Sequence, residues 1–244
     1  MAAKRGLSAS VLFNGYDLST FLRQASPALD MELLDATTFQ AANGDKIFVP
    51  GFRDGKLSLE GFFDSDATDA DEIDDVFNAV IGSETKQVVT VSPEGALTTG
   101  NRCFLIDADT VRYGVQSPAT GLIQSNAEVQ SSSGLGHGVI LQVKASLTAT
   151  GNGATYDSGA SSASGGAGHL HVTAKSGTSP TLDGKIQHST DGSTWADLIT
   201  FAQRTAIGAQ RVEVTGTVNR YLRFIRTIGG TGPSFEVTAA FTRF

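Results

Sequence analysis

The chain has 244 residues, of which 40% are apolar and 18% are charged, and it carries 28 glycines and a formal net charge of −7. Low charge with many glycines is typical of an all-β protein that is rich in turns. The single cysteine, Cys103, excludes a disulfide framework and a zinc site built on cysteines, and we expect it to be a buried apolar residue.

The charge is divided unevenly along the chain. Residues 1–150 hold 10 Lys and Arg against 19 Asp and Glu, whereas residues 151–244 hold 8 against 6. Neither part has the clustered basic residues of an ordinary DNA-binding protein. No segment reaches the roughly 18 apolar residues that span a bilayer, and the start of the chain lacks the apolar run of a signal peptide. We therefore expect synthesis in a cytoplasm without secretion.

The N-terminal segment predicts strands that are interrupted by one long loop. Residues 10–19 read as two short strands around a glycine turn. In residues 26–39, apolar residues alternate with acids, which indicates a strand with one apolar face. Residues 36–55 show no periodicity, and loops of this length are usually functional. Alternation resumes from residue 56, which predicts a second strand.

One helix is predicted at residues 69–82, because its apolar residues recur at helical spacing and Gly82 is suited to end it. The glycine-rich residues 134–138 are predicted to form a hairpin turn. Strands are expected around these elements at 86–93, 102–116, 121–131 and 138–149.

A change of composition at residues 148–153 marks the start of a second part. Residues 154–168 are rich in Gly, Ser and Ala, and form either a flexible linker or, as we prefer, a turn-rich entry into a second β domain. Regular spacing predicts a β-sandwich of about 90 residues, with strands at 168–175, 183–190, 195–201, 210–215, 220–228 and 234–243. We therefore predict an all-β protein with one short helix and two domains, at residues 1–150 and 154–244, the second an Ig-like or jelly-roll β-sandwich.

Two segments could bind metal, and each has a structural explanation that we prefer. Residues 64–75 hold many acids but lack the Gly and Glu positions of an EF-hand, so they read as a solvated helix start. His169 and His171 share one strand face and could bind zinc together with His188. Such pairs are more often exposed or packed across strands, so we expect no metal and no cofactor.

Two aromatic segments could bind other ligands. Trp195 follows an Asp-Gly turn and could stack on a sugar ring, although a core position is favoured. Residues 220–226 interleave arginines with aromatic residues, a pattern that can bind nucleic acid, although ordinary strand packing is preferred. No catalytic motif is present, and we expect that the protein is not an enzyme.

The order of segments in residues 35–82, which begin "DATTFQAANGDKIFVPGFRDGKLSLEGFFD", resembles the tail tube proteins (major tail proteins) of long-tailed, siphovirus-like phages. In that family, a strand that ends in a Thr pair precedes a long loop with a Gly-Asp-Lys-like turn. A Pro-Gly-x-x-Asp-Gly segment, a strand that ends in glycine and aromatics, and a helix follow. The resemblance covers residues 1–150, and residues 154–244 are similar to extra β-sandwich domains that such proteins carry.

This resemblance implies a structural virion protein whose copies form rings, usually hexameric, that stack into a tail tube for DNA delivery. Each chain would give strands to a continuous inner β-barrel. The implied partners are other copies of the chain and the tape measure, tail terminator and tail-tip proteins. Double-stranded DNA would pass through without specific binding, and no membrane anchor is implied. The protein would be made in the host cytoplasm and would reside in the virion tail.

The resemblance also implies that residues 36–55 form an assembly arm, which reaches the neighbouring subunit or the next ring. The residues expected to make this contact are Phe39, Asp45, Lys46, Phe48, Pro50, Gly51, Phe52, Arg53, Asp54 and Gly55.

Four predicted strands each have an unusually polar face. If these faces line the bore, its wall is hydrophilic and mildly acidic, with four acids against two lysines, and it does not hold DNA. The alternative is the solvent face of an ordinary sandwich. The predicted lumen-facing residues are Asp30, Glu32, Lys56, Ser58, Glu60, Gln124, Asn126, Glu128, Gln130, Gln142, Lys144 and Ser146.

Two other functions remain open. One is a different virion β protein, such as a tail-tip or head-decoration subunit, which would lack ring-on-ring stacking. The other is a glycan-binding module that contacts sugar through Trp195. In the tube interpretation, residues 154–244 project outward, and their removal is expected to leave tube formation largely intact.

Overall fold

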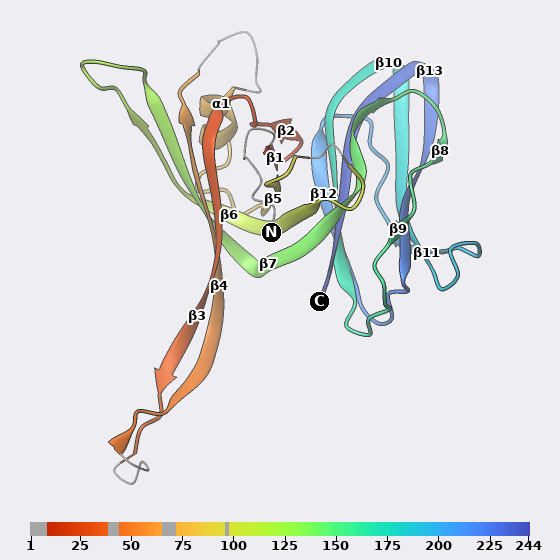
Figure 1. Ribbon diagram of the computed structural model, residues 1–244. Coiled ribbons are helices and arrows are strands. Elements are labelled where there is room, and N and C mark those ends of the chain that lie inside the picture. Colours follow the sequence, from red (N-terminus) through yellow and green to blue (C-terminus); the bar gives the residue numbers. More distant parts are fainter. Residues whose placement is uncertain (1–8, 39–43, 65–71, 96–97) are drawn as a thin grey trace.

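The computed structural model describes residues 9–38, 44–64, 72–95 and 98–244 (Figure 1). Within these ranges the chain is almost entirely β, with one short helix and a single antiparallel network of 13 strands. This confirms the predicted all-β class. The main path of the sheet runs β11-β10-β13-β7-β6-β5-β1-β2, and the remaining strands branch from it. No helix in the described ranges is long and apolar enough to cross a membrane.

The elements have the following bounds: β1 Ser10–Phe13, β2 Tyr16–Asp17, β3 Leu22–Asp35, β4 Phe48–Phe62, α1 Ile73–Asn78, β5 Gln87–Ser92, β6 Arg102–Gln116, β7 Gln124–Leu147, β8 Gly151–Asn152, β9 Tyr156–Asp157, β10 Gly166–Ser189, β11 Ala196–Thr200, β12 Gly208–Val214 and β13 Tyr221–Arg243.

The first core is formed by side chains from α1, from β1 and β5, and from a four-stranded ribbon of β3, β4, the start of β7 and the end of β6. Alternation along β4 places Leu57 and Leu59 on one face, and both are buried. From α1, Phe77 packs into this core with its ring 5.0 Å from that of Phe13 and 5.4 Å from that of Tyr113. The ribbon therefore has one face covered by the core and one face left polar.

The helix is shorter than predicted. It runs Ile73–Asn78 instead of residues 69–82, of which residues 69–71 lie outside the described ranges. Beyond Asn78 the chain forms a tighter turn, in which the carbonyl of Phe77 accepts from the amide of Val80, three residues on, as well as from that of Ile81.

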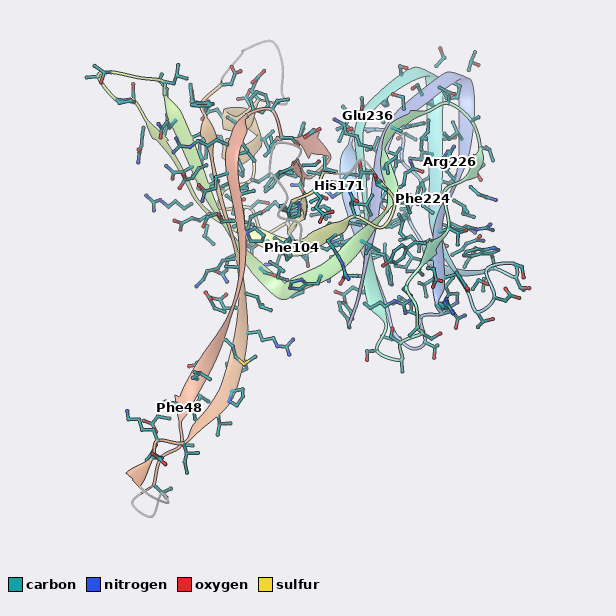
Figure 2. All side chains as sticks on the ribbon, in the orientation of Figure 1. Phe48, Phe104, His171, Phe224, Arg226 and Glu236 are labelled. Carbon is teal, nitrogen blue, oxygen red and sulfur yellow. The ribbon has the colours of Figure 1, made fainter. Side chains whose placement is uncertain are left out.

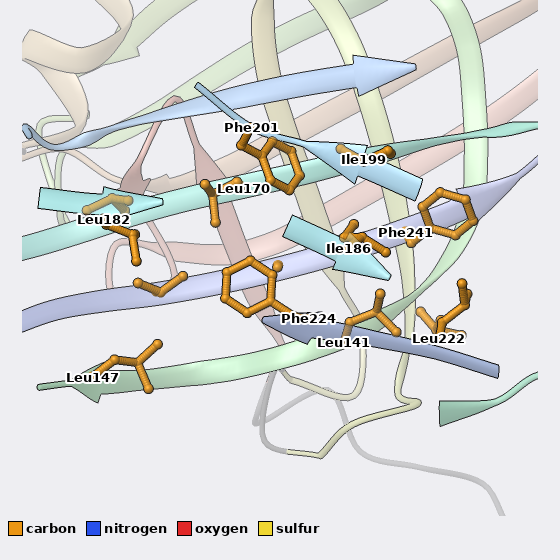
Figure 3. Packing of buried hydrophobic residues seen from close by; sticks show 14 of the residues in the cluster. Leu141, Leu147, Leu170, Leu182, Ile186, Ile199, Phe201, Leu222, Phe224 and Phe241 are labelled. Atoms are coloured by element: carbon orange, nitrogen blue, oxygen red, sulfur yellow. The ribbon is translucent and has the colours of Figure 1, made fainter. Parts of the chain in front are cut away.

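The second core lies inside a ladder of β10 and β13 that folds back over itself. The antiparallel pairs run from Gly166 and Arg243 to Ser189 and Tyr221, with three register shifts between them. Both ends of the ladder contribute side chains to one buried cluster, so the ladder forms two layers around it (Figure 3). This two-layer packing forms the expected C-terminal sandwich, whose Ig-like or jelly-roll topology stays a prediction.

Three predicted pairs of strands are single strands in the structure. β7, β10 and β13 run unbroken through glycine-rich stretches where the sequence predicted turns. The predicted hairpin turn at residues 134–138 lies inside β7, where a Cβ atom on Gly138 would lie 2.5 Å from the carbonyl oxygen of Phe241. Glycine at this position permits close approach of two strands and does not reverse the chain.

The predicted loop at residues 36–55 is also partly strand. β4 begins at Phe48, so only residues 36–47 connect it to β3. The sequence of this strand does not show regular alternation of apolar and polar residues. The pairing of β3 with β4 shifts register between Met31 and Leu33, and such a shift changes the face on which the following side chains lie.

β7 belongs to both cores. Residues 124–130 pair with β4, whereas residues 138–147 pair with β13. The second part of the strand contributes three side chains to the second core: Val139, Leu141 and Leu147. The division of the chain at residues 150–154 stays a prediction, but any such division leaves both cores sharing one strand.

Cys103 is only 2% exposed, which confirms the predicted buried cysteine. It lies in a small third cluster with Leu105, Ile140 and Ala240, where β6, β7 and β13 meet. Burial raises the pKa of its thiol far above the usual value, so the group behaves as an apolar side chain.

Candidate assembly surface

The polar face of the four-stranded ribbon lies opposite the first core. Its members alternate with the buried residues of β4 and β7, and part of the face forms a shallow groove of about 310 Å³. Eight of the twelve predicted lumen-facing residues meet here: Asp30, Lys56, Ser58, Glu60, Gln124, Asn126, Glu128 and Gln130. The long-range register of β3, β4 and β7 brings them together on one face, and whether this face lines a bore stays a prediction.

The charges described on this face are paired. Arg23 lies 3.2 Å from Glu60, Arg112 lies 3.3 Å from Glu128, and Lys56 lies 2.9 Å from Asp54 and 3.6 Å from Asp30. Three cations against four acids leave a net charge of −1. A hydrogen bond from Lys56 holds the pKa of the Asp54 carboxyl below its usual value, so this pair stays ionised at neutral pH.

Sequence reasoning missed three of these charged residues. Asp54 fell in the predicted loop, and Arg23 preceded the predicted strand. Arg112 follows a register shift after Thr110, so simple alternation could not place it. One of the three was detectable from the sequence. Asp54 lies two residues before Lys56, and residues at this spacing in a strand lie on the same face.

We expect these surface ion pairs to contribute little to stability. Glu128→Gln should lower the free energy of unfolding by less than about 1 kcal/mol, because both partners are more than half exposed and solvent screens them. Urea denaturation measures the change. As a comparison, Lys144→Met should cost more, because Lys144 is half-buried between two acids. A larger loss for Glu128→Gln than for Lys144→Met would contradict this ranking.

Three other predicted lumen-facing residues lie away from the polar face, on the part of β7 that pairs with β13. Gln142 is buried, and Ser146 is exposed opposite Glu236. Lys144 hydrogen-bonds the Asp17 carboxylate and lies 3.5 Å from Glu236. These residues continue the polar pattern of β7, but here the strand pairs with β13 and no longer belongs to the four-stranded ribbon.

β3 and β4 continue beyond the sheet as a two-stranded arm (Figure 1). Its surface is apolar and exposed, with Phe52 at 85% and Leu33 at 62%, and Figure 2 shows Phe48 toward its end. The other large exposed apolar residues of the arm are Leu29, Met31, Leu34, Ile47, Phe48 and Val49. An apolar surface of this kind usually marks a contact with another protein.

Most of the predicted assembly residues lie on this arm. Phe39 falls outside the described residues, and Asp45 and Lys46 precede β4, where Lys46 lies 3.6 Å from Asp35. The others lie on β4 itself: Phe48, Pro50, Gly51, Phe52, Arg53, Asp54 and Gly55. Glu32, predicted to face the lumen, also lies on the arm, where a Cβ atom on Gly51 would lie 2.9 Å from its carboxylate.

Both edges of the four-stranded ribbon lack a partner strand among the described residues. Within the described ranges, β3 pairs with β4 alone. β6 pairs with β5 as far as Ala108, and beyond it residues 111–116 pair with β7 and with no other described strand. Pro27 in β3 has no amide hydrogen, which is typical of an edge strand. Long open edges with exposed apolar residues invite pairing with another chain.

The remaining ligand candidates lie on the second half of the chain. The guanidinium of Arg223 covers one face of the half-buried Trp195 ring at 4.1 Å, so a stacked sugar would need the other face. Leu222 and Phe224 enter the second core, as expected for ordinary strand packing.

His169 and His171 are fully buried and not on the surface. The Thr90 hydroxyl lies between their rings, and the His188 Nδ1 atom instead accepts a hydrogen bond from the Asn219 amide. In the described part of the chain, no group of three or more His, Cys, Asp or Glu side chains could hold a metal ion. In the acidic stretch at residues 64–75, residues 65–71 lie outside the described ranges.

No protein-family model and no curated protein matches the chain. Among solved structures, the chain is similar to a protein in the virion of a native gene transfer agent particle, with 16% identity and a TM-score of 0.42 over 55% of this chain and 98% of that chain. It is similar to the SPP1 tail tube protein, with 11% identity and a TM-score of 0.40 over 53% of this chain and 76% of that one. A third similarity is to the SPP1 Dit protein of the hub adsorption apparatus, with 10% identity and a TM-score of 0.38 over 96% of this chain and 98% of that one. Similarity at this level assigns no function to the chain.

Proposed function

We propose that this chain is a structural protein of a phage tail, whose copies join side by side into rings that stack into the tail tube. The ring number of six comes from the family resemblance. The proposal rests on one observation above all: among the residues that the structure describes, the four-stranded ribbon has an open edge on each side, at β3 and at residues 111–116 of β6.

The directions of these two edges suit a closed ring. Neighbouring strands of the ribbon are antiparallel, so β3 and β6 run in opposite directions. A neighbour related by rotation would therefore place its β3 antiparallel to β6, and the same contact would repeat around the ring. Closure leaves no exposed edge. Pro27 would interrupt the new ladder at one position, so pairing would extend on either side of it.

The polar face would line the bore of such a ring, because the first core covers the opposite face. Its charges are paired and its net charge is −1. Such a wall has no excess of cations to release counterions from DNA, so a passing duplex gains no affinity for it. The proposed bore is thus close to neutral, and less acidic than the sequence count indicated.

The apolar arm would supply the contact between rings, since it extends beyond the sheet and needs a partner for its exposed side chains. The second half of the chain would lie outside the barrel. A tail-tip subunit is the alternative, and it would form a ring without stacking.

Negative-stain electron microscopy of the concentrated protein, with and without added salt, tests the proposal. Hollow rods or stacked rings are the expected result. Single rings that do not stack would favour a tail-tip protein, and closed shells or isolated trimers would contradict the tube.

Hydrogen–deuterium exchange tests the edge contact itself. On assembly, amides in β3 and in residues 111–116 should both become protected, whereas those of β12 should not. Protection of β3 alone would indicate a two-fold dimer through one edge, and would contradict ring closure.

A further inference from the structure

The two halves of the chain touch through a buried polar contact between strands that are not neighbours in the sheet. β5 of the first half faces β10 of the second, and His171 lies in the space between the halves (Figure 2). Close by, the backbones also meet, because a Cβ atom on Gly15 would lie 2.4 Å from the Cα atom of Gly208. The tail-tube proposal makes no use of this junction.

Four side chains form one directed chain of hydrogen bonds across the junction. Arg211 Nη1 lies 3.1 Å from His169 Nε2, and because arginine can only donate, this ring nitrogen must accept. The ring hydrogen of His169 is therefore on Nδ1, 3.0 Å from the Thr90 hydroxyl. Thr90 in turn lies 2.9 Å from His171 Nε2, and its hydroxyl hydrogen is free to be donated there.

This arrangement requires a neutral His169 and is compatible with a neutral His171. A proton on His169 Nε2 would oppose the guanidinium of Arg211, and a proton on His171 Nε2 would turn the Thr90 hydroxyl hydrogen away from that ring. The series of hydrogen bonds ends at His171. Its Nδ1 atom and the hydroxyl of Thr238, which pairs with His171 across the strands, are both buried without a hydrogen-bond partner among the described residues.

The charged groups around the histidines offset an added proton only in part, because Asp17 favours a proton on His171 but is itself paired with Lys144. Lys144 of β7 engages Asp17 of β2 and Glu236 of β13. On β12, Glu213 lies 2.6 Å from Arg211, so it too is already paired. Asp107 of β6 also acts on Arg211, and burial raises the pKa of its carboxyl. The carboxylates described around these imidazoles are thus either already paired or disfavoured as anions by burial.

We propose that Arg211, His169, Thr90 and His171 form an acid-released clasp that holds the two halves together at neutral pH. Acid breaks the clasp and lets the halves separate at this junction, while each keeps its own core. The second half would then swing about β7 and β13, the strands that connect the two cores.

The pKa shifts agree in sign with this device. Burial lowers the pKa of His171 to about 3 and lowers that of His169 well below its usual value. A group whose pKa is depressed in the closed state favours closure above its ordinary value near 6.5, and loses that contribution as the pH falls below it. The opening equilibrium should therefore shift roughly tenfold per histidine for each pH unit below about 6.5.

Small-angle X-ray scattering of the full chain tests the clasp, at a concentration where it is monomeric and from pH 8 down to pH 4.5. We expect a reversible rise in the radius of gyration below about pH 6. The double variant His169→Asn, His171→Gln keeps an amide near the ring atoms that meet Thr90 but cannot titrate, so it should stay compact. The matched control, His137→Gln with His188→Gln, should expand like the wild type.

The proposal is wrong if the wild type stays compact throughout, or if the titration-deficient variant expands at the same pH. Circular dichroism at pH 8 shows whether that variant folds. If it does not, imidazole NMR of the wild type decides the matter. If His169 and His171 become protonated only at the pH where the chain expands, the clasp is supported. If their imidazoles are charged while the chain is still compact, the proposal is wrong.

Discussion

A chain that ends at residue 150 is expected to aggregate and not to fold as an independent first half. Without β13, residues 138–147 of β7 lose the strand that pairs with them along one edge. They also expose the side chains that enter the second core, at Val139, Leu141 and Leu147. Burial of such side chains contributes roughly 1.5–3 kcal/mol each, and their joint loss is comparable with the whole stability of about 5–15 kcal/mol of a typical domain.

The soluble fraction after expression, followed by sedimentation velocity, measures this effect. A matched control separates loss of the second half from cleavage of the chain. A protease site inserted at the exposed residues 159–161 should give two fragments that stay soluble and elute together. A monodisperse, folded fragment 1–150 would show that the first half folds without β13. It would then support the expectation, drawn from the sequence, that tube formation does not need residues 154–244.

Replacement of two arm phenylalanines is expected to abolish assembly while leaving the fold intact. Phe48 and Phe52 are 50% and 85% exposed, so Phe48→Ser with Phe52→Ser should change the free energy of unfolding by no more than about 1 kcal/mol. If both rings are buried in a contact between copies, their loss should raise the concentration needed for polymers by roughly 100-fold or more.

Sedimentation of polymers over a concentration series measures this change, and thermal unfolding checks the fold. The control carries two exposed apolar residues of the second half, Ile207→Ser and Phe244→Ser, which should leave the assembly threshold unchanged. Polymers of the arm variant at the wild-type threshold would show that the arm makes no contact between copies.

Local patterns in the sequence were enough for the fold class and for the polar face near residues 56–60 and 124–130. Here Leu57 and Leu59 alternate with polar residues, and a strand needs no distant information to separate its two faces. The same reasoning failed at the arm, because a register shift between Met31 and Leu33 breaks the period. It also assigned Lys144 to the polar face, since alternation does not show where a long strand leaves one sheet.

By itself, the sequence determined an all-β chain with one short amphipathic helix, a buried Cys103 and a distinctive segment between two strands. These features depend on side-chain periods and turn residues within a few positions of one another. Only the tertiary structure decided that β7, β10 and β13 are continuous, that Arg23 and Arg112 pair with acids of the polar face, and that His169 and His171 are buried against Thr90. Each of these depends on partners far along the chain, whose register is set by the packing of whole strands and not by neighbouring residues.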